Sequence, residues 1–487
     1  MLKKLETKER NIVFVISMII SCLLYIIFLQ GYYSLDAHRL MIPGFDYYAI
    51  NDASFNDGRL FMGWICLIGD ALNLSYVPFY QILLFIAIII SCACVVEIYK
   101  TVNHYKPLTK KVNKVLIFLV SFLYIFNFFY VNSMEFVECI VMAISIYMYI
   151  KAIQYIIIEN KYIIGILFTI IGMFAYQGTA PLFVSTAILI SILENKQINK
   201  KCIKQLCVCA ISLIIAVFLD EIFINLYNIG GNSRASGENA FKYLFLNISN
   251  FYVTIVYSLR MFPTYLWLIL VFLILLVIFF YCKKVKKLNV PIYTLFIIIF
   301  TCCSQFILFI LEESNYPHQG RTFLAIGSLI SSIIIYAYVS TNILEDKNKY
   351  KDILSGIIIF YFLVTAVETV YLQISYKQAM KIDYSFSKKI EQIIEKEKEN
   401  GNEVTQMCFY YRESSNDVKL NIEGAVRERS KLAVGTYGVY TYEIYTGKDI
   451  KYNLEAEEEE YKKYFENQNT PIEFKVVGDT VYIGVLV

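Results

Sequence analysis

Eleven long apolar runs occupy most of this 487-residue chain, and they constrain its fold more than any other feature. The runs lie at about 11–31, 77–99, 114–131, 136–157, 162–176, 179–194, 203–225, 264–282, 291–311, 322–342 and 353–374. A hydrocarbon layer of roughly 30 Å needs about 20 apolar residues per spanning helix, and the backbone inside it must satisfy its own hydrogen bonds. The sequence therefore predicts a polytopic α-helical membrane protein with about eleven transmembrane helices.

The composition agrees with a bilayer and excludes other classes. Hydrophobic residues make up 57% of the chain and charged residues only 17%, which lies far from the balance of a soluble domain. A net charge of +3 is too small to indicate a nucleic-acid partner. Residues 11–30 follow a basic start and resemble a signal peptide, but no small-residue cleavage site follows, so we expect a retained helix.

The distribution of lysine predicts the orientation. Basic residues are concentrated in the N-terminus and in every second connection, notably around Lys106–Lys114, Lys200–Lys204 and Lys283–Lys287. Because cytoplasmic connections carry more Lys and Arg, we expect a cytoplasmic N-terminus and, with an odd number of spans, an extracytoplasmic C-terminus. The excess of Ile, Lys, Asn and Tyr suggests an AT-rich bacterial genome, and therefore a bacterial plasma membrane as the location.

The weakest point of this topology is the sequence YQGTAP at residues 176–181, between two short runs. It is either a tight outer turn or a break within one bent element. A single re-entrant element would move every later loop to the other side of the membrane. The lysine bias of the later loops favours the turn.

We divide the chain into a transmembrane domain at 1–375 and a small extracytoplasmic α/β domain at 376–487. The predicted outer loops are 32–76, 226–262 and 312–321. The first has an amphipathic pattern at 59–74 and the second a mixed pattern at 241–257, both suited to helices on the membrane surface. In the tail we predict helices at 383–399 and 455–468 and strands at 404–411, 437–445, 472–477 and 480–487.

Carboxylates in the first outer loop are the leading candidates for chemistry. Asp46, Asp52 and Asp57 lie there with Arg59, and Asp36 and Arg39 come shortly before. Carboxylates can deprotonate or orient an acceptor hydroxyl, or bind a divalent cation, and arginine suits a phosphate. The alternative is that these aspartates only cap turns in a polar loop.

Several other charged residues are expected at the same outer side. Glu135 and Glu138 fall between the third and fourth predicted helices, where an ionisable group at membrane depth is a functional candidate. Further candidates for substrate binding are Arg234, Arg260, His318 and Arg321, with Tyr47 and Tyr48 after Asp46 for stacking on a sugar ring. Asp220 and Glu221, near the end of the seventh predicted helix, are expected to face the same outer cavity, and for Glu368 a structural role is as open as a chemical one.

The cysteines and histidines do not predict a metal centre. Twelve cysteines lie mostly inside apolar runs, no CxxC pair is present, and the three histidines are scattered. We therefore predict no bound metal among the site residues. The acidic run Glu457–Glu460 is interpreted as a solvated helix face.

This arrangement resembles the bacterial membrane glucosyltransferases of the serotype-converting O-antigen type, within the GT-C class of polyprenyl-phosphate-sugar-dependent transferases. The resemblance is based on the single N-terminal helix, the acidic loop GFDYYAINDASFNDGRLFMGWI, the later YPHQGRT ahead of a helix, and the small C-terminal domain. It covers the whole chain in topology and a few dozen residues in motif. In that family adjacent acidic residues are common in the first outer loop, whereas here Asp46 is followed by Tyr47.

The resemblance implies a GT-C-like fold and transfer of a sugar, expected to be glucose, from a polyprenyl-phosphate donor to a surface polysaccharide or glycolipid. An acidic residue of the first outer loop would serve as the base, which falls on Asp46 or Asp52. No cofactor is required, because the lipid phosphate is already charged, and a divalent cation such as Mg²⁺ or Mn²⁺ is optional.

Two other functions stay open at this point. A transporter or flippase for a lipid-linked sugar would share the topology, although such proteins often carry internal repeats and none is evident between the two halves. A surface-polysaccharide polymerase would also share the topology and would differ in its donor and acceptor.

Overall fold

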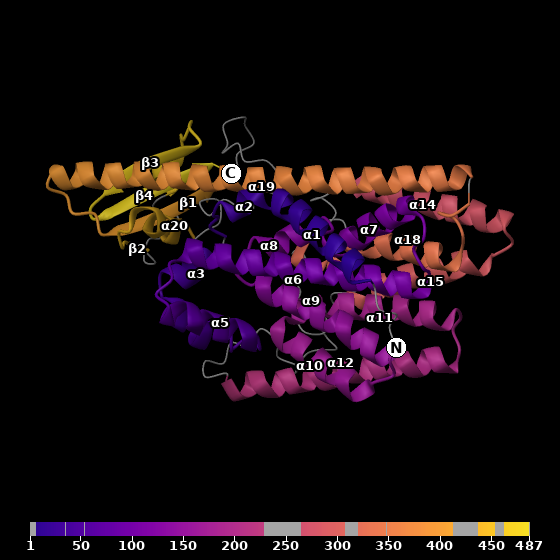
Figure 1. The fold of residues 1–487 in the computed structure, drawn as a ribbon. Helices are drawn as coiled ribbons and strands as arrows, with labels where there is room; N and C mark the ends of the chain where they lie inside the picture. The colour runs from indigo at the N-terminus through magenta and orange to yellow at the C-terminus, as the bar shows by residue number, and fades with distance from the viewer. Residues whose placement is uncertain are drawn as a thin grey trace. The chain divides into compact units, whose positions relative to one another are not determined.

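The computed structural model describes residues 6–34, 36–52, 54–227, 264–306, 320–346, 348–412, 437–452 and 462–486. Within these residues the chain is mostly helical, and its strands all lie after residue 400 (Figure 1). The chain separates into two compact units. Unit 1 holds Met1–Gln30, Asp46–Leu74 and Pro78–Val370, and unit 2 holds Gly31–Phe45, Ser75–Val77 and Tyr371–Val487.

Unit 1 is built from helices and short turns. Its helices, some only in part, are α1 (Thr7–Leu24), α2 (Ile26–Leu29), α4 (Phe45–Tyr47), α5 (Leu60–Ala71), α6 (Tyr76–Tyr105), α7 (Lys111–Ile125), α8 (Tyr130–Met134), α9 (Cys139–Ile153), α10 (Tyr162–Ala175), α11 (Ala180–Asn195), α12 (Lys200–Tyr227), α14 (Thr264–Lys284), α15 (Asn289–Ser304), α17 (Leu324–Gly327), α18 (Leu329–Ser340) and α19 (Lys349–Glu399). The π-helical turns are η1 (Tyr48–Asp52) and η2 (Gln154–Ile158), and the 3₁₀ turns are η3 (Gln177–Thr179) and η5 (Gly320–Thr322).

Six helices among the described residues are long and apolar enough to cross a membrane by length and composition. They are Tyr76–Tyr105, Cys139–Ile158, Gln177–Asn195, Lys200–Leu226, Leu266–Lys284 and Lys349–Glu399. These helices indicate a multi-pass membrane protein. Each of the eleven predicted apolar ranges contains a helix in its described part, whereas the count of eleven spans stays a prediction.

Several serines inside the apolar helices donate to their own backbone. The hydroxyl of Ser17 donates to the carbonyl of Val13 at 2.8 Å, and that of Ser91 donates to the carbonyl of Ala87 at 2.7 Å. Such bonds to the preceding turn let serine sit in a helix without an unsatisfied group. The apolar runs therefore remain helical across their serines.

The start and the end of α10 lie beside opposite ends of α12. The Lys204 ammonium, near the start of α12, is 5.6 Å from the ring centre of Tyr162, the first residue of α10. The side chain of Gln177, just past the end of α10, donates to the Asp220 carboxylate near the end of α12, at 3.0 Å. These two contacts show that α10 and α12 run in the same direction.

Helix α11 returns in the opposite direction. It begins at Ala180, directly after η3, and at its end Asn195 donates to the side chain of Gln205 near the start of α12, at 2.8 Å. The sequence YQGTAP is therefore a turn between two antiparallel helices, as the lysine pattern favours, and not a break in one bent element.

The first predicted outer loop is divided between the two units. Residues 31–45, with α3 (Ala37–Met41), belong to unit 2, and residues 46–74 belong to unit 1. The helix predicted at 59–74 is confirmed as α5. Its inner face includes the buried Met62 and Cys66, and Trp64 and Ile68 are exposed. Both faces of α5 are thus apolar at their centres.

Unit 2 contains a four-stranded sheet of order β2-β1-β4-β3. The strands are β1 (Gln406–Arg412), β2 (Lys451–Tyr452), β3 (Ile472–Val477) and β4 (Thr480–Leu486). Strand β1 is parallel to β2 and β4, and β3 and β4 are antiparallel. The strands predicted at 404–411, 472–477 and 480–487 are confirmed.

The strand predicted at 437–445 is wrong, because these residues form the helix α20 (Tyr437–Thr446). Alternating aromatic residues favoured a strand, but Val439 and Tyr442, three positions apart, both enter the core of unit 2. Gly438 allows α20 to approach the sheet, since a methyl group there would lie 2.4 Å from the Phe409 ring. Packing against the sheet thus decides the helix.

Helix α19 continues without a break across residue 375, the boundary that we drew between the two domains (Figure 1). Its 51 residues correspond to about 77 Å at 1.5 Å per residue. The helix predicted at 383–399 is its last part, and Ile390 there joins the core of unit 2. Of the helix predicted at 455–468, residues 455–461 lie outside the described residues, and the 3₁₀ turn η8 (Lys463–Phe465) lies in the rest. The boundary itself stays a prediction.

Candidate functional site

A tight turn ahead of α5 carries two of the predicted site residues. The backbone N–H of Arg59 donates to the carbonyl of Ser54 at 2.8 Å, which closes the turn of residues 54–59. Gly58 has a φ of +73°, and a methyl group there would lie 2.5 Å from Asp220 Oδ1. Glycine is required because the backbone is left-handed and close to α12.

Arg59 lies between two carboxylates. Its Nη1 is 3.4 Å from Glu138 Oε1, and its Nη2 is 3.6 Å from Asp57 Oδ2. The hydroxyl of Tyr48, on η1, donates to the same Glu138 Oε1 at 2.6 Å. The Arg59, Asp57 and Glu138 side chains are 13%, 11% and 3% exposed. Solvent therefore screens these charges only weakly.

Gln177 connects this turn to α12. Its side-chain amide donates to the backbone carbonyl of Asp57 at 2.8 Å and to Asp220 Oδ2 at 3.0 Å. Asp220 is 5% exposed. The turn before α5, the turn between α10 and α11, and the end of α12 are thus held at one place.

Tyr176 completes the group. The Arg59 guanidinium lies 5.3 Å from the centre of its ring, within the range of a cation–π contact. Burial acts to lower the pKa of Arg59, but Asp57, Tyr176 and Glu138 outweigh burial and raise this pKa above its usual value. Arg59 therefore stays charged. We call the set Tyr48, Asp57, Arg59, Glu138, Tyr176, Gln177 and Asp220 the Arg59 cluster.

The Arg59 cluster has more acceptors than donors. Three carboxyl groups face one guanidinium, and within the described residues Asp57 Oδ2, Glu138 Oε2 and Asp220 Oδ1 accept no hydrogen bond. Arg59 Nε donates none there. Buried polar atoms normally have partners. A ligand that carries hydroxyl groups fits, because a hydroxyl can donate to a carboxylate and accept from a guanidinium.

A second arginine lies against the same connection between α8 and α9. The Arg321 guanidinium, on η5, is 4.5 Å from the ring centre of Phe136, two residues before Glu138. Gly320 brings η5 close to α8, since a methyl group there would lie 2.2 Å from Asn132 Oδ1. Arg321 is 8% exposed and Glu135 is 1% exposed. Both arginines therefore contact the four-residue connection Glu135–Glu138.

The structure brings together some of the predicted site residues and separates others. Asp57, Arg59 and Glu138 contact one another directly, and Asp220 joins them through Gln177. Asp46 and Tyr47 are exposed and Asp52 is half-buried, and none of these three belongs to the Arg59 cluster. The predicted residues Arg234, Arg260 and His318, and the helix predicted at 241–257, lie outside the described residues. Asp36 and Arg39 belong to unit 2.

The sequence interpretation missed two members of the cluster. Tyr176 and Gln177 were considered only as parts of a turn. One signal is present in the sequence: Gln177 places a side-chain amide with two N–H donors at the predicted turn. Its partners, however, lie far along the chain.

No group of three or more His, Cys, Asp or Glu side chains in the described part of the chain is arranged to hold a metal ion. The Arg59 guanidinium lies between Asp57 and Glu138, where a cation would bind both carboxylates. We therefore assign no step to a divalent cation.

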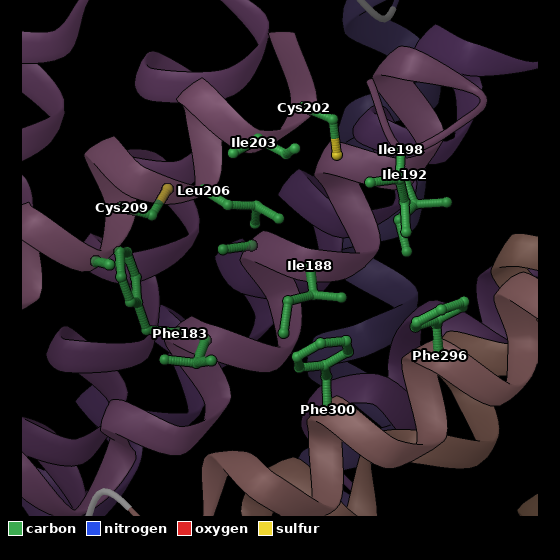
Figure 2. Close-up of a pocket in the computed structure, with 13 residues that line it drawn as sticks. Phe183, Ile188, Ile192, Ile198, Cys202, Ile203, Leu206, Cys209, Phe296 and Phe300 are labelled. Carbon is green, nitrogen blue, oxygen red and sulfur yellow. The ribbon is translucent and has the colours of Figure 1, made fainter. Parts of the chain in front are cut away.

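An apolar pocket of about 420 Å³ lies elsewhere in unit 1, between α11, α12 and α15. Its lining includes Phe183, Ile188, Leu206, Phe296 and Phe300 (Figure 2). None of the lining residues is charged. The pocket can hold hydrocarbon, but none of its lining residues offers a positive charge to a phosphate.

The fold defines a mostly helical chain of the multi-pass membrane class, with a small C-terminal sheet and a buried charged cluster at one end of its bundle. Comparison with protein-family models, curated proteins and solved structures found no match to this chain.

Replacing Gly58 with alanine tests the close approach in this cluster. We expect Gly58→Ala to lower the apparent melting temperature in detergent, because left-handed backbone costs about 1–3 kcal/mol for other residues and the methyl group meets Asp220. Gly447→Ala is the control, since Gly447 has a φ of +69° and nothing within 4 Å of the added methyl. The loss in Gly58→Ala should be the larger one and should shrink in an Asp220→Ala background. Equal losses at both glycines would contradict the close approach.

Proposed function

We propose that this protein is an integral membrane glycosyltransferase that moves a sugar, expected to be glucose, from a polyprenyl-phosphate donor to a hydroxyl of a cell-surface polysaccharide or glycolipid. The observation that carries the proposal is the Arg59 cluster. In this cluster three buried carboxylate oxygens accept no hydrogen bond from the residues that the structure describes. An acceptor hydroxyl is the simplest group that supplies such donors.

The chemistry follows from these acceptors. Displacement at an anomeric carbon requires a base that removes the acceptor proton and a stabilised phosphate as the leaving group. Asp57 is the residue that we assign as the base, because it combines a predicted first-loop position with an oxygen that accepts no hydrogen bond from a described residue. Glu138 neutralises Arg59 from the other side and is oriented by Tyr48.

The donor phosphate is assigned away from Arg59. Two carboxylates already flank this guanidinium, so an added anion there would meet an excess of negative charge. We assign the phosphate to Arg321. Its guanidinium contacts the Phe136 ring, so it lies on the Glu135–Glu138 connection that Arg59 also contacts.

The proposed topology keeps the finer predictions. We propose eleven spans, a cytoplasmic N-terminus, a GT-C-like arrangement, and the Arg59 cluster, Arg321 and the C-terminal α/β domain on the extracytoplasmic side of a bacterial plasma membrane. The antiparallel arrangement of α10 and α11 supports this, because it preserves the alternation of sides that the lysine pattern requires.

Reconstituted protein distinguishes transfer from transport. We expect liposomes that contain the wild-type protein and polyprenyl-phosphate glucose to form a glucosylated product from n-octyl glucoside, a hydroxyl-bearing acceptor probe. The Asp57→Asn/Glu138→Gln double variant should form none. Movement of the labelled lipid across the vesicle without a new glycosidic bond would favour a flippase and overturn the proposal, as would the absence of both product and donor turnover.

A further inference from the structure

We propose that Gln177 is the positioning residue of the Arg59 cluster, whose amide fixes the turn of residues 54–59 to the end of α12 so that Asp57 and Arg59 face Glu138. The catalytic consequence rests on the proposed function. The positioning itself rests on geometry, and the two are tested separately.

The amide of Gln177 uses one nitrogen for two bonds. The same Nε2 donates to the Asp57 carbonyl and to Asp220 Oδ2, so both of its N–H groups have an acceptor. These acceptors come from two segments that are far apart in the chain, the turn before α5 and the end of α12. The amide is thus a two-way link between them.

Gln177 projects from a turn that is itself held firmly. The hydroxyl of Ser145, on α9, donates to the carbonyl of Tyr176 at 3.1 Å and lies 2.6 Å from the hydroxyl of Thr179. Thr179 also donates to the carbonyl of Tyr176 at 2.9 Å. The position of η3, and with it the root of the Gln177 side chain, is therefore set by α9.

Without the amide, two acceptors would face each other. The Asp57 carbonyl and the Asp220 carboxylate repel when no donor lies between them, so the turn that carries Asp57 would move away from the end of α12. Asp57 and Arg59 are on either side of Gly58 and would move together. A misplacement of roughly 1 Å at a reacting group costs about 100-fold in rate.

The first test replaces Gln177 with leucine, which keeps the volume and removes the donor. We expect hydrogen exchange of the peptide that spans residues 54–60 to accelerate at least about tenfold, because its Gly58 and Arg59 amides open more often. Gln205→Leu is the matched control. The Gln205 amide also donates to a backbone carbonyl, that of Ile157, at 2.8 Å. Along α12, Gln205 lies about 22 Å from Asp220. It should leave exchange at 54–60 unchanged.

The second test restores a donor from the other side. Gln177→Glu alone places a third acceptor in the contact and should open the turn at least as much as leucine. Adding Asp220→Asn supplies a side-chain amide that can donate to the new carboxylate, so slow exchange at 54–60 should partly return. A residue that only stabilises the fold would not show this paired rescue.

The third test measures the rate of glucose transfer to n-octyl glucoside, expressed per molecule of folded protein, for each variant. We expect Gln177→Leu to lower kcat about 100-fold with a smaller change in KM for n-octyl glucoside, and Gln205→Leu to alter neither. If the wild-type protein transfers no sugar, the proposed function fails while hydrogen exchange still decides the positioning. Unchanged exchange in Gln177→Leu, or an equal change in Gln205→Leu, would overturn the role of Gln177.

Discussion

Replacing Arg59 with leucine is expected to lower the free energy of unfolding by about 3–5 kcal/mol, the range found when one partner of a buried ion pair is removed. The reason is what the substitution leaves behind. Glu138, 3% exposed, and Asp57, 11% exposed, would both lose the guanidinium that lies between them. Denaturant titration of the detergent-solubilised protein measures the loss.

A second ion pair in unit 1 provides a control with the same separation and different burial. Lys201 Nζ lies 3.4 Å from Glu194 Oε1, equal to the distance between Arg59 and Glu138, but the lysine side chain is 54% exposed. Exposed pairs contribute about 0–1 kcal/mol, so Lys201→Leu should change stability little. Equal losses in the two variants would mean that burial does not strengthen the Arg59 pair.

A double variant isolates the charge effect. Arg59→Leu/Glu138→Leu removes both charges of the closest pair, so we expect it to be more stable than Arg59→Leu alone. The recovery should be incomplete, because Asp57 remains and the hydroxyl of Tyr48 loses its acceptor. Strictly additive losses would show that the two side chains do not interact.

The largest expected effect on activity is at Asp57. If Asp57 removes the acceptor proton, Asp57→Asn should lower the transfer rate by about 10²- to 10⁴-fold, the usual contribution of a general base. Asparagine has nearly the same shape and keeps the turn, so the protein should remain folded. The measurement is glucosylated n-octyl glucoside formed per molecule of folded protein.

Asp46 is the matched control for this prediction. It is an equal candidate in the sequence, but its side chain is exposed and is not part of the Arg59 cluster. Asp46→Asn should therefore retain transfer within about tenfold of the wild type, and Asp52→Asn should fall between the two. Loss of transfer in Asp46→Asn with full transfer in Asp57→Asn would move the active site away from the Arg59 cluster.

The sequence by itself determined the helices and most of the sheet. Apolar runs of bilayer length can satisfy their backbone only as helices, so the ranges of α6, α9 with η2 and α12, and the part of α19 at 353–374, follow from local composition. Alternation between short apolar runs predicted β1, β3 and β4 for the same local reason. It failed at 437–445, where Val439 and Tyr442 form α20 because they pack on the sheet.

The sequence also supplied a list of charged candidates but could not select among them. Asp46, Asp52 and Asp57 have the same chemistry and lie within twelve residues of one another. Only the position of Gly58 against α12 and the contact of Arg59 with Glu138 distinguish Asp57. Arg59 and Glu138 are 79 residues apart in the chain.

The tertiary structure alone decided that the turn before α5, the connection before α9, the turn after α10 and the end of α12 meet at one place. No local pattern encodes such a meeting, because hydrophobic periodicity specifies which face of a helix is buried and not which distant segment covers it. The hydrogen bonds of Gln177 illustrate the point, since they join residues 120 and 43 positions away. The apolar runs therefore fix the class of protein, whereas the packing of the helices fixes the site.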